Sequence, residues 1–451
     1  MAKGPGSRRG RCVTTTTSSA LPDMTPSWAT ASREATVAIM RAVKWILLVI
    51  ALVAATIVIG AILLVDQSRS TTASQQAALA SFYEPPSPMP QDLGTVVRME
   101  PLGVDVPGGT GYRMLYVSER PDGERAVSGG MLFIPSTPAP AGGRPVVAWA
   151  HGTLGMGDAC TPSRSTNPLQ DTDNWLGEMM DLGWVVVSTD YVGMGTPGPN
   201  LYLVAQAEAR DVVNSARAAR NVPEADAGNR FIAWGHSQGG HSSLWTGHLA
   251  KTLAPELDLI AVAAAAPAAE LNRIIGAQWA TPVGWVIGPE VEQSWPVVYP
   301  SLPLEGVVTA RGIANSERLA NECIKAAALE GLARTDLGQD YFVADPVMNE
   351  AWARVGEDQT PAPLPADMPV MIAQSTADQV VLAWPNGVLQ ESWCAAGSAI
   401  SMLWLGQVSH QDTAMVAGPQ VVSWIADRFA GRPAGRTCDV PPPVRAPSQT
   451  G

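Results

Sequence analysis

The stretch Trp-Gly-His-Ser-Gln-Gly-Gly, residues 234–240, constrains the fold more than any other part of this chain. The apolar run before it, residues 230–234, predicts a buried strand, and the residues after it predict a helix. Ser237 therefore stands on a tight turn, with Gly235 two residues before it and Gly239 two residues after it. Such a turn exposes a serine hydroxyl at the edge of a sheet, where glycines let strand and helix pass closely.

A plain glycine turn is the alternative interpretation, because the chain has 42 glycines. A serine that acts as a nucleophile needs a base, an acid that orients the base, and N–H donors for an oxyanion. The rest of the chain must supply these groups.

The body of the chain alternates strand-like and helical segments, which predicts a mostly parallel α/β sheet with helices on both faces. Three early segments, 95–102, 112–118 and 129–134, are expected to be antiparallel strands. Later strands are expected at 145–150, 184–189, 230–234, 259–265, 369–374 and 400–405, with helices at 175–182, 203–220, 241–253 and 413–429.

This alternation stops in residues 268–366, which contain several tryptophans, many prolines and helical runs such as 316–331. We interpret this segment as a largely helical cap inserted into the sheet domain. The domain itself would then comprise residues 92–267 and 367–440. A separate downstream domain would not explain the strands that return after residue 367.

Residues 45–65 form an apolar run without a charged residue. Its length matches the roughly 20 residues that span a bilayer, so it predicts a transmembrane helix. Residues 1–44 are expected to be disordered and cytoplasmic, because basic residues flank this side. A cleaved signal peptide with a start at Met24 or Met40 is the alternative, and the protein would then be secreted. We expect an extended linker at 66–91 and a disordered tail at 441–451.

The net charge of −12 is unevenly distributed, because residues 1–44 carry seven basic and two acidic residues. The acidic remainder argues against nucleic acid as a partner. The sequence has no zinc-type Cys/His spacing, P-loop or dinucleotide fingerprint, so we expect no metal and no organic cofactor. We expect a monomer.

His410 is the expected base. It lies between the last predicted strand and the last predicted helix, on a loop that can reach a serine at a strand end. The chain has five histidines, and the other four lie beside glycines at strand ends or on the helix after the serine: His151, His236, His241 and His248.

Asp378 is the expected acid. It follows the strand at 369–374 and precedes His410, which is the Ser…Asp…His chain order of one class of hydrolases. Asp367 and Asp412 are weaker candidates, because neither stands at the carboxyl end of a strand.

The oxyanion donors are expected to be the backbone N–H groups of Gln238, after the serine, and Thr153, in the loop after the strand at 145–150. Gly152 would let this loop approach the substrate. A simple glycine turn is the alternative for this loop.

With these residues the chain resembles the α/β-hydrolase fold and, within it, the secretory lipase family of exported lipases and esterases. The resemblance is carried by residues 82–88, 151–153, 160–163, 190–198 and 235–240. It implies a triad of Ser237, Asp378 and His410 and a helical cap that shapes an acyl-binding tunnel. The predicted membrane anchor departs from the cleaved signal that this family usually has.

Four cysteines lie outside the membrane in this interpretation, and from the residues alone three pairings, or four free thiols, are open. The resemblance implies that Cys160 pairs with Cys323 and that Cys394 pairs with Cys438.

The expected function is therefore that of a serine carboxylic-ester hydrolase, a lipase or esterase for apolar acyl esters, acting outside the cytoplasm. An envelope acyltransferase with the same triad is one alternative. A catalytically inactive binding protein with this fold is another.

Overall fold

The computed structural model describes residues 40, 41, 43–49 and 73–447. The chain divides into two units, Met1–Thr71 and Thr72–Gly451. In the first unit, the described residues are helical. Within the described ranges, no helix combines the length and the apolar character needed to span a bilayer. Most of the predicted span at 45–65 lies outside these ranges, so the anchor stays a prediction.

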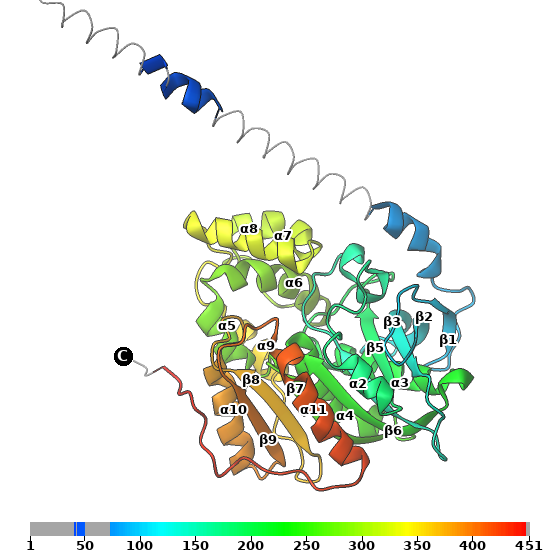
Figure 1. The fold of residues 1–451 in the computed structure, drawn as a ribbon. Helices are drawn as coiled ribbons and strands as arrows, with labels where there is room; N and C mark the ends of the chain where they lie inside the picture. The colour runs from blue at the N-terminus through cyan, green and yellow to red at the C-terminus, as the bar shows by residue number, and fades with distance from the viewer. Residues whose placement is uncertain (1–39, 42, 50–72, 448–451) are drawn as a thin grey trace, which may run out of the picture. The chain divides into compact units, whose positions relative to one another are not determined.

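The second unit is built on a nine-stranded sheet in the order β1-β2-β3-β5-β4-β6-β7-β8-β9. β1, β2 and β3 pair antiparallel with their neighbours, whereas β5, β4, β6, β7, β8 and β9 run parallel to one another. The predicted mostly parallel sheet is therefore confirmed (Figure 1). The strands are β1 Val96–Pro101, β2 Gly109–Glu119, β3 Arg125–Pro135, β4 Arg144–Ala150, β5 Val185–Val192, β6 Ala227–His236, β7 Asp258–Ala265, β8 Val370–Ser375 and β9 Ile400–Leu405.

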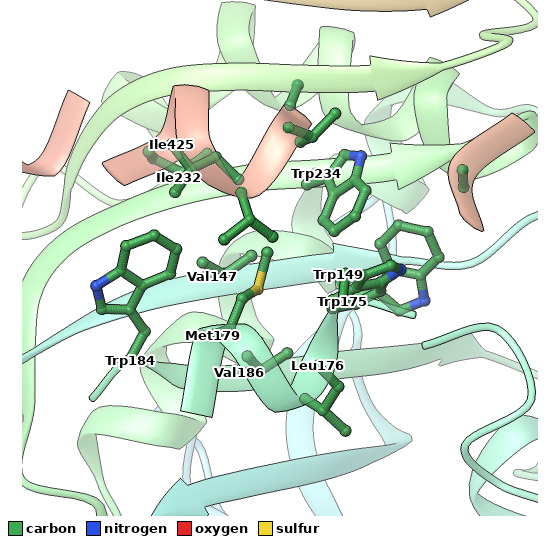
Figure 2. Close-up of a cluster of buried hydrophobic side chains, with 14 of the residues drawn as sticks. Val147, Trp149, Trp175, Leu176, Met179, Trp184, Val186, Ile232, Trp234 and Ile425 are labelled. Atoms are coloured by element: carbon green, nitrogen blue, oxygen red, sulfur yellow. The ribbon is translucent and has the colours of Figure 1, made fainter. Parts of the chain in front are cut away.

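Successive side chains of a strand point to opposite faces of the sheet, and in this sheet both sets are apolar. Helices therefore cover both faces. On one face, strand residues pack with α2 (Leu176–Asp181) and α11 (Thr413–Phe429). Figure 2 shows this cluster, in which Trp149, Trp175 and Trp234 lie together with ring centroids 4.3–4.9 Å apart. The opposite face packs against α3 (Ala205–Arg220), α4 (Gln238–Leu253) and α10 (Ala383–Ala395).

The segment between β7 and β8 is helical, although these two strands are neighbours in the sheet. α6, α7 and α8 gather at one end of the sheet (Figure 1), and Trp285, Trp295 and Trp352 of the segment share an apolar cluster with residues 201–204 of the sheet domain. Its helices are α5 Leu271–Gln278, α6 Pro282–Val298, α7 Ala310–Ala320, α8 Ile324–Asp336 and α9 Glu350–Asp358. The cap boundaries at 268 and 366 stay a prediction.

The helical run expected at 316–331 is divided between α7 and α8. The chain leaves the helical conformation at Cys323, which has φ −70° and ψ 147° and precedes α8. A disulfide joins Cys323 to Cys160 in the loop after β4, with Cα atoms 5.2 Å apart. This bond fixes the break between α7 and α8 to the sheet domain.

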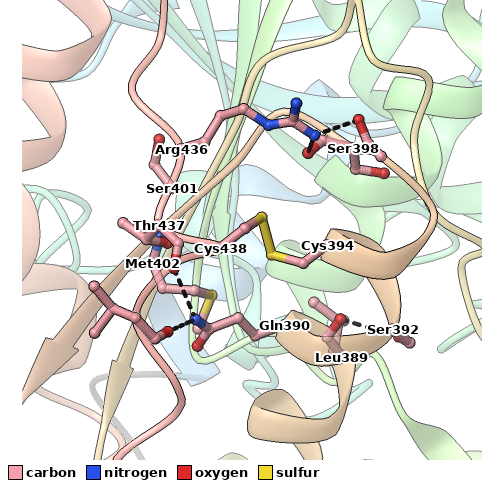
Figure 3. Close-up of a disulfide and its surroundings, with 12 residues drawn as sticks. Leu389, Gln390, Ser392, Cys394, Ser398, Ser401, Met402, Arg436, Thr437 and Cys438 are labelled. Atoms are coloured by element: carbon pink, nitrogen blue, oxygen red, sulfur yellow. Dashed lines mark hydrogen bonds between the residues drawn. A yellow bond between two sulfur atoms is a disulfide. The ribbon is translucent and has the colours of Figure 1, made fainter.

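A second disulfide joins Cys394, at the end of α10, to Cys438 (Figure 3). Both pairs are those that the family resemblance implied. Part of the tail predicted to be disordered at 441–451 instead lies against α10, where Pro442 and Val444 approach Gly387; residues 448–451 lie outside the described residues. The anchoring at Cys438 and a hydrogen bond from the Gln390 side chain to the Val440 carbonyl hold this segment in place.

The extended linker expected at 66–91 is also wrong in part, because residues 73–79 are helical. Side chains of Gln75 and Gln76 donate hydrogen bonds to the Arg164 carbonyl. Tyr83 follows, and its buried hydroxyl bonds the Ser163 hydroxyl at 2.6 Å. These contacts with the sheet domain stabilise a helix that the polar composition alone did not indicate.

Candidate active site

Ser237 occupies the turn between β6 and α4 with φ 56° and ψ −116°. A side chain other than glycine at positive φ is strained and needs surrounding structure to hold it. The Ser237 N–H donates to the Ala265 carbonyl at 2.9 Å. The Ser237 carbonyl accepts from the N–H groups of His241 and Ala268 at 3.0 and 3.2 Å. The sheet and the helix together therefore hold the serine in this conformation.

Gly235 and Gly239 make this turn sterically possible. A Cβ atom on Gly239 would lie 1.9 Å from the carbonyl oxygen of Ala150 in β4. On Gly235 it would lie 2.1 Å from the carbonyl oxygen of Gly239. Both contacts are far below the 3.0 Å that real Cβ atoms respect, so glycine is required at both positions.

The structure brings Ser237, His410 and Asp378 together at one edge of the sheet. Nε2 of His410 lies 2.9 Å from the Ser237 hydroxyl oxygen. Nδ1 of His410 lies 2.7 Å from Oδ2 of Asp378. All three side chains are buried. They come from the ends of parallel strands β6, β8 and β9, which explains how residues distant in sequence converge.

Asp378 also sets the direction of the His410 ring. Its Oδ1 accepts hydrogen bonds from the N–H groups of Val380 and Val381 at 2.9 and 3.0 Å, which turns Oδ2 toward the imidazole. An ionised carboxylate only accepts, so Nδ1 of His410 carries the proton. Nε2 is then free to accept the proton of Ser237. The other candidate Asp412 instead accepts from the Ser409 hydroxyl.

His236 holds the loop that carries His410. Its Nε2 lies 2.9 Å from the His410 carbonyl oxygen, and the two rings lie 4.8 Å apart. Burial lowers the pKa of His236 to about 3, so the ring is neutral and donates through Nε2. The sequence predicted His236 only as a member of the turn.

The remaining histidines bond elsewhere. His241 is buried between the Glu208 carboxylate and the Gln359 carbonyl, at 2.9 and 2.8 Å. His248 bonds the Ala362 carbonyl, and His151 bonds the Gly152 carbonyl. The choice of His410 by elimination agrees with these contacts.

The two expected oxyanion donors belong to segments that meet at the serine turn. Gln238 is the first residue of α4. The loop after β4 approaches the turn, because a Cβ atom on Gly152 would lie 3.4 Å from the Ser237 Cβ. In the part of the chain that the structure describes, the backbone N–H groups of Gln238 and Thr153 make no hydrogen bond. Both are available to a ligand oxygen.

Sequence reasoning missed two residues that support these donors. Glu208 accepts a hydrogen bond from the Gln238 side chain at 2.8 Å. The Tyr202 hydroxyl bonds the Thr153 hydroxyl at 2.8 Å. For Glu208 a signal exists, because a carboxyl on the buried face of the alanine-rich helix α3 is unusual. For Tyr202 we find no signal in the sequence.

The sequence pattern of the secretory lipase family matches residues 162–437, well over half of the chain. One relative, "Secreted triacylglycerol lipase LIP4" of Malassezia globosa, is 24% identical over 46% of this chain and 48% of its own length. The chain thus spans about half of that relative. Another, "Probable inactive lipase MT1628" of Mycobacterium tuberculosis, is 23% identical over 78% of this chain and 82% of its own.

Solved structures have the same fold. Candida antarctica lipase A in its closed state is similar with a TM-score of 0.62 and 17% identity, over 81% of this chain and 89% of that chain. The rice cell wall degrading esterase LipA from Xanthomonas oryzae is similar with a TM-score of 0.62 and 19% identity, over 75% and 98%.

Proposed function

Because this chain belongs to the secretory lipase family, we propose that it is a carboxylic ester hydrolase that forms an acyl-enzyme on Ser237. The observation that carries the proposal is the continuous hydrogen-bond chain from Asp378 through His410 to Ser237. This chain of contacts joins a nucleophile, a base and the acid that orients the base.

In the first half of the reaction, His410 Nε2 takes the proton of the Ser237 hydroxyl as its oxygen attacks the ester carbonyl carbon. The carbonyl oxygen becomes an oxyanion, which accepts hydrogen bonds from the N–H groups of Gln238 and Thr153. Asp378 stabilises the imidazolium. When the C–O bond to the alcohol breaks, His410 gives its proton to the leaving oxygen, and the acyl group stays on Ser237.

In the second half, a water molecule takes the place of the alcohol. His410 removes a proton from water as the hydroxide adds to the acyl carbon. The same N–H groups stabilise the second oxyanion. The bond to Ser237 then breaks, the serine oxygen regains its proton from His410, and the carboxylic acid leaves. Ester and water are thus converted to alcohol and acid without a metal or organic cofactor.

The substrate we propose is an ester with an apolar acyl group. The helical segment between β7 and β8 packs its apolar cluster directly against Leu201 and Leu203, next to Tyr202. Tyr202 bonds Thr153 of the candidate active site, so apolar side chains lie near this site and favour apolar over charged ligands. We place the reaction outside the cytoplasm, because two disulfides persist in oxidising compartments. The protein would be anchored through residues 45–65, or secreted if that segment is cleaved.

An inactive binding protein is the alternative that the name of one relative raises. The geometry here favours catalysis, because each hydrogen bond of the triad is within 2.9 Å.

Labelling with a fluorophosphonate, which reacts with an activated serine, tests the proposal. We expect intact mass spectrometry to show one adduct per chain. The adduct should be lost in Ser237→Ala and retained in Ser243→Ala, where Ser243 is a buried serine of α4, the helix that follows Ser237. Hydrolysis of nitrophenyl esters is expected to follow the same pattern. A folded wild-type protein that is neither labelled nor active would refute the proposal.

A further inference from the structure

Tyr202 is connected to the site by a single hydrogen bond. Its hydroxyl lies 2.8 Å from Oγ1 of Thr153, whose backbone N–H is one of the two oxyanion donors proposed above. The Tyr202 side chain is 3% exposed. Burial raises the pKa of Tyr202 well above its usual range, so the phenol keeps its proton and can donate.

The backbone on both sides of Thr153 is held, because the Tyr191 hydroxyl donates to the His151 carbonyl at 3.1 Å and the Ile324 N–H donates to the Leu154 carbonyl at 2.9 Å. Gly152 lies directly before Thr153, and Gly155 two residues after it has φ 94°. Glycines allow a backbone many orientations, so they do not by themselves fix where an N–H group points. At Thr153 itself, the hydrogen bond of its hydroxyl with Tyr202 is the contact that restrains the residue between these two anchored neighbours.

Tyr202 is itself held firmly. Its backbone N–H donates to the Ser294 hydroxyl of α6 at 3.0 Å, and that hydroxyl donates to the Asn200 carbonyl at 3.0 Å. The next residue, Leu203, has φ 51° and donates its N–H to the Glu208 carboxylate at 2.8 Å. The segment 200–208 is therefore fixed at both of its ends.

The same segment supports the second donor. Oε1 of Glu208 accepts from the Gln238 side chain at 2.8 Å. Oε2 accepts from the Ser242 hydroxyl at 2.8 Å and faces Nδ1 of His241 at 2.9 Å. Residues 200–208 thus bond the side chains of both proposed donor residues, Thr153 and Gln238.

From these contacts we infer that Tyr202 is a positioning residue of the oxyanion hole, acting through the Thr153 side chain. The inference rests on the proposed ester hydrolase function. Tyr202 does not take part in the reaction itself. It holds the Thr153 N–H in the direction that the oxyanion requires, so its loss weakens binding of the transition state more than binding of the substrate.

The test removes the hydrogen bond between Tyr202 and Thr153 by deleting one hydroxyl at a time, in Tyr202→Phe and in Thr153→Val, and both hydroxyls in the double variant. A whole oxyanion donor is worth about 10²–10³-fold in rate, and misplacing it is expected to lower kcat roughly 10- to 100-fold. We expect KM within about twofold of wild type and a matching loss of affinity for an aryl boronic acid, which mimics the tetrahedral intermediate. The double variant should be no slower than the slower single variant.

Two controls separate positioning from a general loss of packing. Tyr116→Phe removes matched buried contacts, because the tyrosine hydroxyl bonds Thr189 Oγ1 at 2.7 Å and the Asp211 carbonyl at 3.1 Å. It should change kcat less than twofold. Thr153→Ser keeps the hydroxyl and should keep most of the activity.

The outcomes are distinct. A folded Tyr202→Phe variant with wild-type kcat, or losses that add in the double variant, would overturn the inference while the proposed function stands. If Tyr202→Phe fails to fold, Thr153→Val decides alone, since it breaks the same bond from the loop. A wild-type protein without esterase activity would overturn both proposals.

Discussion

Replacing Gly239 with alanine tests whether the serine turn is determined by steric fit. The new Cβ would lie 1.9 Å from the carbonyl oxygen of Ala150, 2.4 Å from its carbonyl carbon and 2.6 Å from the carbonyl oxygen of His151. All three atoms belong to the backbone at the end of β4. To reach even 3.0 Å, α4 and β4 must separate by about 1 Å.

This separation has a thermodynamic and a kinetic cost. Overpacking of a side chain typically costs about 1–3 kcal/mol, and a rigid backbone neighbour places this site at the upper end. Alanine gains about 1 kcal/mol of helix propensity in return. We expect a net loss of about 2 kcal/mol or more in the free energy of unfolding. A shift of about 1 Å between Ser237 and the donor loop should lower kcat about 10²-fold.

Urea unfolding, followed by tryptophan fluorescence, and ester hydrolysis measure the two effects. Gly435→Ala is the control, because nothing lies within 4 Å of its Cβ position and its φ is not positive. A Cβ on Gly247, on the same helix, would meet side-chain ends, those of Leu364 at 2.8 Å and Val262 at 3.2 Å, so Gly247→Ala should lose less stability than Gly239→Ala. If Gly239→Ala matches Gly435→Ala in both assays, the steric argument is wrong.

Three further changes have defined outcomes. Asp378→Asn keeps its backbone hydrogen bonds through Oδ1 and turns its NH₂ group toward the base, so kcat should fall roughly 10⁴-fold without loss of helical signal in circular dichroism; a loss under tenfold would contradict the assigned tautomer. Replacing both Cys160 and Cys323 with serine opens a loop of 163 residues, and urea unfolding should show a loss of up to about 5 kcal/mol. Burial raises the pKa of the Glu290 carboxyl well above its usual 4.5, so above pH 4.5 the folded protein keeps a proton that the unfolded chain loses. The free energy of unfolding of the wild type therefore falls as the pH rises above 4.5, by up to about 1.4 kcal/mol per pH unit. Glu290→Gln should therefore be more stable than wild type at pH about 8, whereas Glu292→Gln, which weakens bonds from Ser316 and Tyr341, should be less stable; equal effects would refute this assignment.

The sequence predicts the sheet and the relative order of the triad well, for a local reason. Buried parallel strands are short apolar runs, and the residues that follow them must lie at the same edge. The positions of Ser237, Asp378 and His410 follow from these runs without knowledge of the packing.

The contacts between segments could not be predicted in this way. Nothing near Thr153 in the sequence indicates that Tyr202 will reach it, since the two meet only when the segment after β5 folds back over the loop after β4. The break between α7 and α8 has the same origin, because the disulfide of Cys323 joins segments far apart in sequence. Residues 73–79 also take their helical form beside distant contacts such as the one with Arg164.

The insertion between β7 and β8 also delays the synthesis of His410 relative to that of Ser237. Ser237 lies 173 residues before His410, and the helical segment is made between them. At about 5–20 residues per second, a ribosome completes the serine turn roughly 10–35 seconds before the base exists. A nascent chain therefore carries the proposed nucleophile without the proposed general base throughout that interval. The proposed reaction therefore cannot begin until the strands that carry Asp378 and His410 have joined the sheet.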